Sequence, residues 1–446
     1  MGCGAGFSGD RVDAPQAVVA AIAASGKRGA IMFETLGERT LALGHLARRN
    51  DPNSGYEPLL DEFLRPILPT CVAAAIPIVS NFGAANPMAA AHKIRAAANA
   101  LGLRALKIAV VSGDDVRESI DLDRLERWEG DDVNDTVPGE IIAANVYLGA
   151  QQIAQALRAG AQVVVTGRVA DPALALGPLV AHFGWDWNDW DLIAAGTLAG
   201  HLLECGAQVS GGYFADPGYK DVPDPANIGF PIAEVSANGD IVMTKPAGTG
   251  GRVSTMTVKE QLIYEIHDPA NYLTPDVTLD VTGVKIDEIA ADRVSVRGAR
   301  GKPPPRDLKA TVCFPGDWLG EAEISYAGPN ALARARLAAD VVRRRLAMRG
   351  LAVRARLDFI GIQSVFDSDT SDLQNAFQGE VPEVRLRLAA SAADRDSVKQ
   401  SVQEVLALYC CGPAGGGGVR TSIHNRIRTA SYLVPRHMVR PKVSFL

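Results

Sequence analysis

Four short apolar runs in the first 170 residues each stop at a polar or charged side chain. Residues 30–33 are followed by Glu34, and residues 76–79 by Ser80 and Asn81. Residues 107–111 precede a Ser-Gly-Asp-Asp stretch, and residues 163–165 precede Thr-Gly-Arg. Short continuous apolar runs that alternate with longer helical patterns are typical of parallel strands buried on both faces. The pattern therefore predicts an α/β fold with a mostly parallel, doubly wound sheet.

The side chains that end these runs are expected to meet at one edge of the sheet. Ligands of such sheets bind outside the carboxyl ends of the strands. The sequence therefore predicts an active site that contains Glu34, Asn81, Asp114, Asp115 and Arg168.

The side chains at two of these strand ends could have more than one role. Asp114 and Asp115 could supply a general base or hold a divalent cation, or one of them could cap the next helix. Gly167 and Arg168 open a helix at which Asp171 is the expected N-cap. The arginine could bind a carboxylate or phosphate of a ligand, or pair with Asp114 or Asp171.

The composition of the chain argues against several classes of protein. The chain has 446 residues, 47% of them hydrophobic, and a net charge of −6, which gives no electrostatic reason to expect nucleic acid or an anionic membrane surface. No apolar run approaches the roughly 20 residues of a membrane span, and the Ala-rich stretch at 17–24 lacks the preceding basic segment of a signal peptide. Six cysteines without CxxC spacing indicate reduced thiols, so we expect a cytoplasmic protein.

Changes in the residue pattern along the chain predict three domains. Residues 1–235 read as the α/β domain with the ligand site, and 236–320 as a β-rich segment in which Val and Thr alternate with polar residues. Residues 321–446 read as β-α-β-β-α-β, which predicts a C-terminal ferredoxin-like α+β domain.

Glycine-rich loops are candidate anion sites, because backbone N–H groups without a neighbouring Cβ can approach an anion closely. The first loop offers Gly4, Gly6 and Gly9 with Asp10 and Arg11, and could bind an anion or the phosphate of an acyl-CoA. A nicotinamide fingerprint is the weaker interpretation, because no strand is visible before the loop, and a structural turn is a third.

A second glycine loop contains Gly250, Gly251 and Arg252 and allows either an anion nest or a flexible hinge.

His201, Glu204 and Cys205 stand at i, i+3 and i+4, hence on one face if this segment is helical. Such a trio could perform acid–base chemistry, contact substrate or ligate Zn²⁺. A core histidine beside a buried cysteine is the plainer alternative.

Longer phrases resemble the acyclic terpene utilization (AtuA-like) family over nearly the whole chain. They include GCGAGFSGDR (2–11), SNFGAANPMAAA (80–91), VVTGRVADPALALGPL (164–179), GTLAGHLLECGAQVSGGYFADPG (196–218) and TKPAGTGGRV (244–253). The resemblance implies a bacterial catabolic setting with acyl-CoA carboxylation and β-oxidation-type enzymes, and a small ferredoxin-like partner protein in some cases. It implies no catalytic residues.

These observations favour a hydratase or dehydratase acting on a branched carboxylic acid or its CoA thioester, with Glu34, Asp114 and Asp115 or His201 and Glu204 as acid and base. A non-catalytic acyl-CoA-binding or scaffold subunit is the alternative, and a nicotinamide oxidoreductase is a weaker one. A divalent metal ion remains open as a cofactor, with CoA as part of the substrate. Tryptophans at 185, 187 and 190 favour a homo-oligomer.

Overall fold

The computed structural model describes residues 1–128, 140–368 and 370–446. They fall into two compact units. Unit 1 takes Met1–Val137, Ile141–Cys313 and Thr429–Leu446, and unit 2 takes Pro138–Glu140 and Phe314–Arg428, less the residues outside the described ranges. Unit 1 thus has three segments of the chain and unit 2 has two, and the chain returns to unit 1 for its last residues, which differs from the expected boundaries at 235 and 320.

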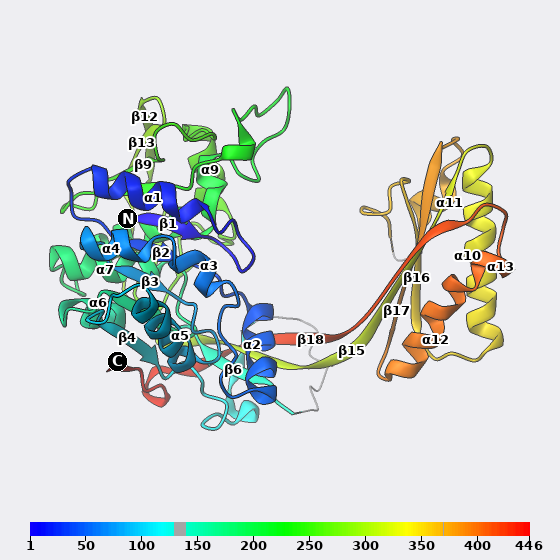
Figure 1. The fold of residues 1–446 in the computed structure, drawn as a ribbon, viewed down its shortest axis with the longest axis horizontal. Helices are drawn as coiled ribbons and strands as arrows, with labels where there is room; N and C mark the ends of the chain where they lie inside the picture. Colours follow the sequence, from blue (N-terminus) through cyan, green and yellow to red (C-terminus); the bar gives the residue numbers. More distant parts are fainter. Residues whose placement is uncertain (129–139, 369) are drawn as a thin grey trace. The chain divides into compact units, whose positions relative to one another are not determined.

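The sheet of unit 1 has a parallel centre. Its strands are β1 (Gly2–Ala5), β2 (Ile31–Phe33), β3 (Ile78–Ser80), β7 (Val163–Thr166) and β4 (Ile108–Ser112), hydrogen-bonded in that order. In Figure 1, β1 to β4 follow one another from top to bottom in unit 1. The four predicted strands are present and parallel, so their carboxyl ends share one edge.

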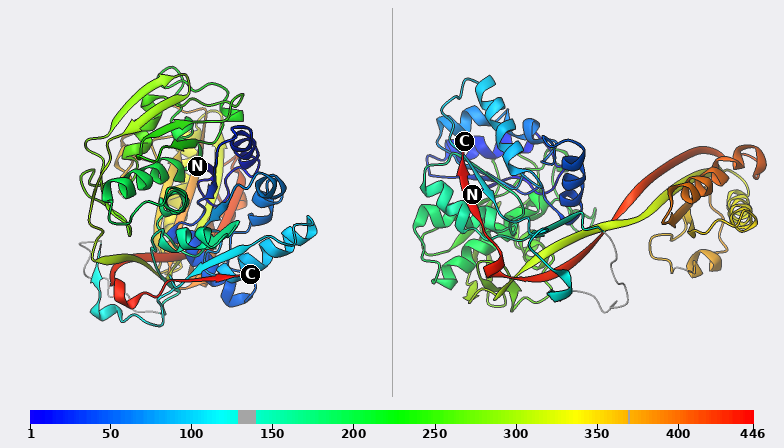
Figure 2. Two further views of the ribbon diagram at one scale, coloured as in Figure 1. Left: turned by 90° about the vertical axis from the view of Figure 1, so that its left-hand side faces the viewer. Right: turned by 90° about the horizontal axis from the view of Figure 1, so that it is seen from below.

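Antiparallel strands extend this centre on both sides, so the sheet as a whole is mixed. Beyond β1 lie β8 (Ile232–Val235), β9 (Ile241–Thr244), β13 (Arg293–Arg297) and β12 (Lys285–Ala290). Beyond β4 lies β19 (Lys442–Phe445), formed by the red end of the chain in Figure 2. The segment predicted as a separate β-rich domain thus contributes three strands to the main sheet.

Helices cover both faces of the parallel centre. Neighbouring strand residues point to opposite faces, and nearly all of them are buried here. One group of helices contains α1 (Ala14–Ala24), α3 (Leu60–Leu64), α4 (Leu68–Ala73) and α5 (Pro87–Ala100). A second group, packed in sequence, contains α6 (Gln151–Arg158), α7 (Ala173–Phe183) and α8 (Trp190–Glu204). No helix in the described ranges has the length and apolar character needed to cross a membrane.

The first strand corrects an expectation. The glycine run was expected to follow a missing strand, but Gly2–Ala5 is itself strand β1, paired with β2 and β8. A Cβ at Gly2 would lie 2.3 Å from Val18 Cγ1, and one at Gly4 would lie 2.4 Å from the Phe33 ring. Glycine is therefore required here by close packing, and the loop proper begins at Gly6.

Unit 2 contains one antiparallel sheet and its helices. Along the chain come β15 (Asp307–Ala327), α10 (Ala331–Met348), β16 (Arg354–Ile360), α11 (Asp372–Ala376), β17 (Glu383–Ala392), α12 (Arg395–Leu406), α13 (Leu408–Cys411) and β18 (Gly417–Pro435). The predicted element order is found, with α11 and α13 as additional short helices. The sheet order is β16-β17-β15-β18, and α10 and α12 pack on β17 over a core that includes Tyr326 and Leu386.

Candidate active site

A cavity of about 1330 Å³ opens at the carboxyl ends of β1, β2 and β7 in unit 1. Its walls come from the loop after β1, residues 34–38 after β2, residues 168–172 after β7, and the end of α8. Further parts of the walls come from segments 207–213, 264–275 and 305–309, and from Trp128, Tyr147 and Leu433. The predicted edge of the sheet is therefore hollow, and three strand ends reach the cavity.

Glu34 lines this cavity while remaining largely buried. Its Oε1 accepts hydrogen bonds from Leu36 N (2.7 Å) and from Asn81 Nδ2 (2.9 Å). Asn81 is fully buried, and its Oδ1 accepts from Thr35 N (2.8 Å). Asn81 is thus behind the cavity wall and holds Glu34 in place.

Arg168 brings a buried positive charge to the cavity. Its Nη1 lies 3.0 Å from Asp171 Oδ1 and also donates to Leu36 O, while its guanidinium lies 4.0 Å from the centre of the Tyr147 ring. The Tyr147 hydroxyl donates to Glu38 Oε1 at 2.6 Å. Asp171, the expected helix cap, makes no cap hydrogen bond, because Pro172 is the N-cap of α7. Its carboxylate is therefore free to pair with Arg168.

The last turn of α8 supplies a second acidic group. Glu204 lines the cavity, and its Oε1 lies 2.9 Å from His201 Nδ1, as the i, i+3 spacing predicts. His201 itself is buried, with Nε2 3.1 Å from Leu262 O and its ring packed on Tyr272. Glu204 Oε2 is buried and has no hydrogen-bond partner within the described ranges. That oxygen is therefore an unpaired acceptor at the cavity wall.

Burial makes both cavity carboxyls unusually weak acids. Desolvation and the neighbouring Asp171 charge raise the pKa of Glu34 to about 8, although Arg168 opposes them. Desolvation raises the pKa of Glu204 to about 7 against the opposing effect of His201. Burial opposes the charging of His201, but its contacts with Glu204 outweigh this and raise the His201 pKa. Carboxyls that titrate near neutrality are suited to give and take protons.

The first glycine loop holds a carboxylate of its own chain. Gly6 N and Arg11 N donate to the two oxygens of Asp10 at 2.9 and 2.8 Å. A negative side chain therefore occupies the place predicted for a ligand anion. Gly9 has a φ of +100°, in the left-handed region that favours glycine.

Neither of the other predicted arginines reaches the cavity. Arg11 pairs with Asp13 (2.9 Å) and donates to Ile228 O (3.3 Å). In the second glycine loop, the N–H groups of Gly250, Gly251 and Arg252 donate to carbonyls of residues 227, 223 and 210 at 2.7–2.8 Å. The loop is thus closed by its own chain, so the predicted anion nest is not formed there.

Asp114 lies behind Arg168 and does not line the cavity. Its Oδ2 accepts from Arg168 N and from Asn145 Nδ2, both at 2.8 Å, and Asn145 Oδ1 is 2.9 Å from His45 Nε2. A Cβ at Gly167 would lie 2.5 Å from Asp114 Oδ2, so glycine makes this approach possible. Asp115 is exposed and accepts from Arg117 N (3.1 Å). The expectation that both carboxylates line the pocket is wrong.

This arrangement predicts different results for two substitutions. Asp114→Ala leaves two buried donors, Arg168 N and Asn145 Nδ2, without an acceptor, and should reduce the free energy of unfolding by about 1–3 kcal/mol for each donor. Asp114→Asn keeps one acceptor oxygen and should lose much less. Urea denaturation of both variants measures the difference. Equal losses would show that the charge of Asp114, rather than its acceptor oxygen, is what the fold needs.

Within the described ranges, no group of three or more His, Cys, Asp or Glu side chains is arranged to hold a metal ion. His201, Glu204 and Cys205 therefore do not form the zinc site that their spacing allowed. Burial raises the pKa of the Cys205 thiol, which keeps it protonated.

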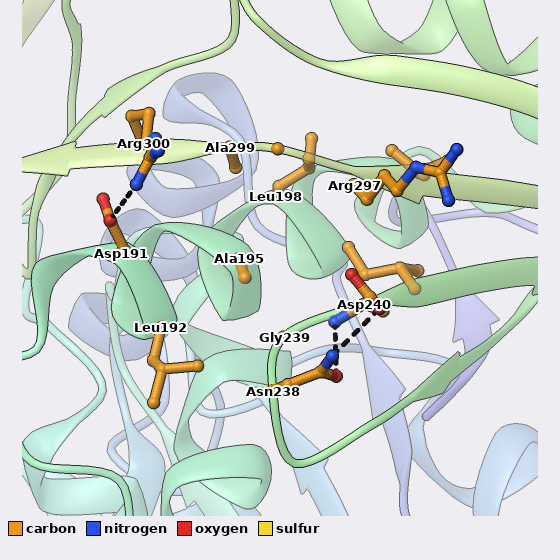
Figure 3. A pocket seen from close by; sticks show the side chains of 13 residues that line it. Asp191, Leu192, Ala195, Leu198, Asn238, Gly239, Asp240, Arg297, Ala299 and Arg300 are labelled. Carbon is orange, nitrogen blue, oxygen red and sulfur yellow. Dashed lines mark hydrogen bonds and ion pairs between the residues drawn. The ribbon is translucent and has the colours of Figure 1, made fainter.

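A second hollow of about 280 Å³ shares no lining residue with the cavity (Figure 3). It lies between the start of α8, the turn from β8 to β9, and the segment from β13 to β14 (Arg300–Lys302). Both of its arginines are already paired, Arg300 with Asp191 at 2.5 Å and Arg297 with Asp287 at 3.0 Å. The remaining carboxylate of its lining, Asp240, accepts a hydrogen bond from Asn238 Nδ2 at 3.0 Å.

Several cavity residues escaped the sequence analysis. They are Glu38, Tyr147, Tyr272, Arg306 and Lys309. Glu38 comes several residues after strand β2, and the other four follow no predicted parallel strand. Antiparallel pairing of β6 (Ala143–Val146) with β15 brings Tyr147 beside Lys309, because Tyr147 N donates to Lys309 O at 2.9 Å. Only that long-range pairing could have identified Tyr147 and Lys309 as neighbours.

Comparison with known proteins gives one informative match. The model of the acyclic terpene utilisation family protein AtuA matches residues 1–445. The chain belongs to this family. Its members are associated with the catabolism of acyclic terpenes, which confirms the resemblance drawn from the sequence.

The other comparisons add no argument. No curated protein matches the chain. Among solved structures, the chain is similar to the de novo designed protein Foldit4, with 9% identity over 25% of this chain and 99% of that chain. The TM-score is 0.18, too low to support a conclusion about this AtuA family member.

Proposed function

We propose that this AtuA family member is a hydratase or dehydratase acting on a branched, acyclic carboxylic acid or its CoA thioester. One observation carries the proposal: two buried carboxyls with raised pKa values, Glu34 and Glu204, line a single cavity with the Arg168–Asp171 ion pair. Paired groups of this kind are typical of sites where one carboxyl donates and another accepts a proton.

The reaction assigns a separate task to each carboxyl. In dehydration, a base takes the proton from the carbon next to the carbonyl while an acid protonates the departing hydroxyl, which leaves as water. Glu34 is mostly protonated at neutral pH and suits the acid. Glu204, which has His201 on one oxygen and a free second oxygen, suits the base. Hydration runs the same steps in reverse.

The two alternatives receive less support. A scaffold or acyl-CoA-binding subunit has no need of buried carboxyls that titrate near neutrality around a cavity. A nicotinamide oxidoreductase would use the first glycine loop for a pyrophosphate, but the carboxylate of Asp10 lies there.

Isotope exchange tests the proposal without knowledge of the natural substrate. The protein is incubated in D2O with branched, α,β-unsaturated acids, their CoA thioesters and the corresponding hydroxy compounds, and NMR follows the hydrogen next to the carbonyl. We expect deuterium to enter at that carbon as water is added or removed, and Glu204→Gln to stop it. A panel in which no compound exchanges faster than in buffer would favour the scaffold.

Unit 2 and the assembly of the protein belong to the same proposal. We interpret unit 2 as a ferredoxin-like domain, supported by its β-α-β-β-α-β order and its sheet order β16-β17-β15-β18. The homo-oligomer and the cytoplasmic location stay predictions. Trp185 is one of the three tryptophans from which the homo-oligomer was predicted. It is buried within its own chain and donates a hydrogen bond to Ala237 O (2.9 Å).

A further inference from the structure

Two cations that line the cavity, Lys309 and Arg306, form no ion pair within the described residues. Lys309 and Arg306 form no hydrogen bond or ion pair with a side chain or carbonyl in the part of the chain that the structure describes, apart from the contact of Lys309 Nζ with the Tyr147 ring at 5.5 Å. Arg168, the third cation of the cavity, is by contrast paired with Asp171 at 3.0 Å. Glu38 is near enough to interact electrostatically with Lys309, but neither cation is held in a direct ion pair in the described parts of the chain. Positive groups that line a cavity without a direct ion pair are suited to bind a ligand anion.

The pairing of β6 with β15 places Lys309 beside Tyr147, in the same cavity as the proton-transfer groups. Tyr147 is the link, because both Lys309 and Arg168 lie over its ring, at 5.5 and 4.0 Å from its centre. Arg168 in turn reaches Asp171 and the loop that contains Glu34. An anion bound to Lys309 would therefore lie close to the Tyr147 ring, which also contacts Arg168, the cation that pairs with Asp171.

The remaining charge of the cavity limits which anion can enter. Eight lining residues are Asp or Glu, whereas three are Arg or Lys. Glu34 is largely protonated near neutrality and Glu204, with a pKa of about 7, only partly, yet an acidic excess remains. A single carboxylate can be held by Lys309 and Arg306 in such a cavity, whereas the several phosphate charges of CoA would be repelled.

We propose that Lys309 and Arg306 form the subsite that binds the carboxylate of a free, acyclic acid, and that the chain acts on the free acid in preference to its CoA thioester. The identification of this anion with the substrate rests on the proposed function. The subsite itself rests on the two unpaired cations and their place in the cavity.

Binding measurements on the full chain test the subsite. Isothermal titration is carried out with dimethyloctanoic acid, with dimethyloctanol as the uncharged analogue of the same skeleton, with dimethyloctanoyl-CoA and with inorganic phosphate. We expect the acid to bind the parent protein, and Lys309→Ala and Arg306→Ala to weaken it roughly 10- to 100-fold. Lys309→Arg should restore most of the affinity, because it keeps the charge.

Matched controls separate charge from packing. Lys285→Ala removes an exposed lysine on β12, outside the cavity, and should bind the acid as the parent does. The alcohol should bind parent and Lys309→Ala equally. Equal loss for acid and alcohol, or an acid that does not bind the parent, would overturn the subsite. Tighter, Lys309-dependent binding of the CoA thioester or of phosphate would overturn the choice of the free acid.

The same variants keep the two proposals distinguishable. Acid binding that depends on Lys309 supports the subsite even if no compound exchanges hydrogen in D2O, an outcome that would remove the hydratase assignment alone. Conversely, Glu204→Gln should no longer catalyse hydrogen exchange in D2O but should bind the acid as the parent does. The Glu204 carboxyl transfers the proton, whereas Lys309 and Arg306 bind the carboxylate of the acid.

Discussion

Glu34→Gln should abolish turnover while making the protein more stable in alkaline solution. The amide is close in shape to a protonated carboxyl, so its oxygen can still accept from Leu36 N and Asn81 Nδ2. It has no proton to give as an acid, and loss of a general acid costs on the order of 10²–10⁴ in rate. Activity lost together with stability gained distinguishes a catalytic group from a structural one.

The sign of the stability change follows from the raised pKa of Glu34, about 8 in the folded protein against an ordinary value of 4.5. The folded state holds this proton more tightly than the unfolded chain does. Its stabilising contribution is therefore complete below the ordinary pKa and is lost as pH rises through about 8, by about 1.4 kcal/mol per pH unit between the two values. Glutamine removes that loss.

Urea denaturation of the parent and the Gln variant between pH 5 and pH 9 measures this effect. The curves should converge at the acidic end and separate at the alkaline end. Glu38→Gln is the matched control: although burial opposes it, Arg168 and Tyr147 lower the Glu38 pKa, so its replacement should bring no alkaline gain. A Glu34→Gln variant without alkaline stabilisation would mean that Glu34 is ionised in the fold.

Arg168→Met should be the most destabilising single change in the cavity. It leaves Asp171 and Leu36 O without their donor, and the buried carboxyls without the nearest cation. Removing one partner of a buried ion pair costs about 3–5 kcal/mol, because the remaining charge is uncompensated. The free energy of unfolding in urea measures the loss.

A second variant shows whether the lost charge is the cause. Arg168→Met with Asp171→Asn removes both charges and should recover part of the stability, so the two effects should not add. The single variant should also improve toward acidic pH as the carboxyls protonate. If the double variant is no more stable than Arg168→Met, then the packing of the arginine on Tyr147, rather than its charge, holds the site.

The parallel centre of the sheet was predictable because the signal is local. Buried parallel strands need continuous apolar residues, and the four runs supplied them together with the polar residues that follow. The i, i+3 contact of His201 with Glu204 was predictable for the same reason, since helix geometry alone sets that spacing. Strand β1 was missed because Gly and Ala have low strand propensity, and its place is set by the close packing of Val18 and Phe33.

The sequence by itself determined that polar side chains gather at one edge of the sheet, because parallel strands end on the same side. Tertiary structure decided which of them face the cavity. Asp114 follows its strand as Arg168 does, but the missing Cβ of Gly167 lets its carboxylate turn inward to the Arg168 N–H. Lys309 and Tyr272 arrive from segments more than 100 residues further along the chain than Arg168. Lys309 is placed by the pairing of β15 with β6, which no local pattern encodes. Contacts between segments that are distant in the sequence therefore completed the site.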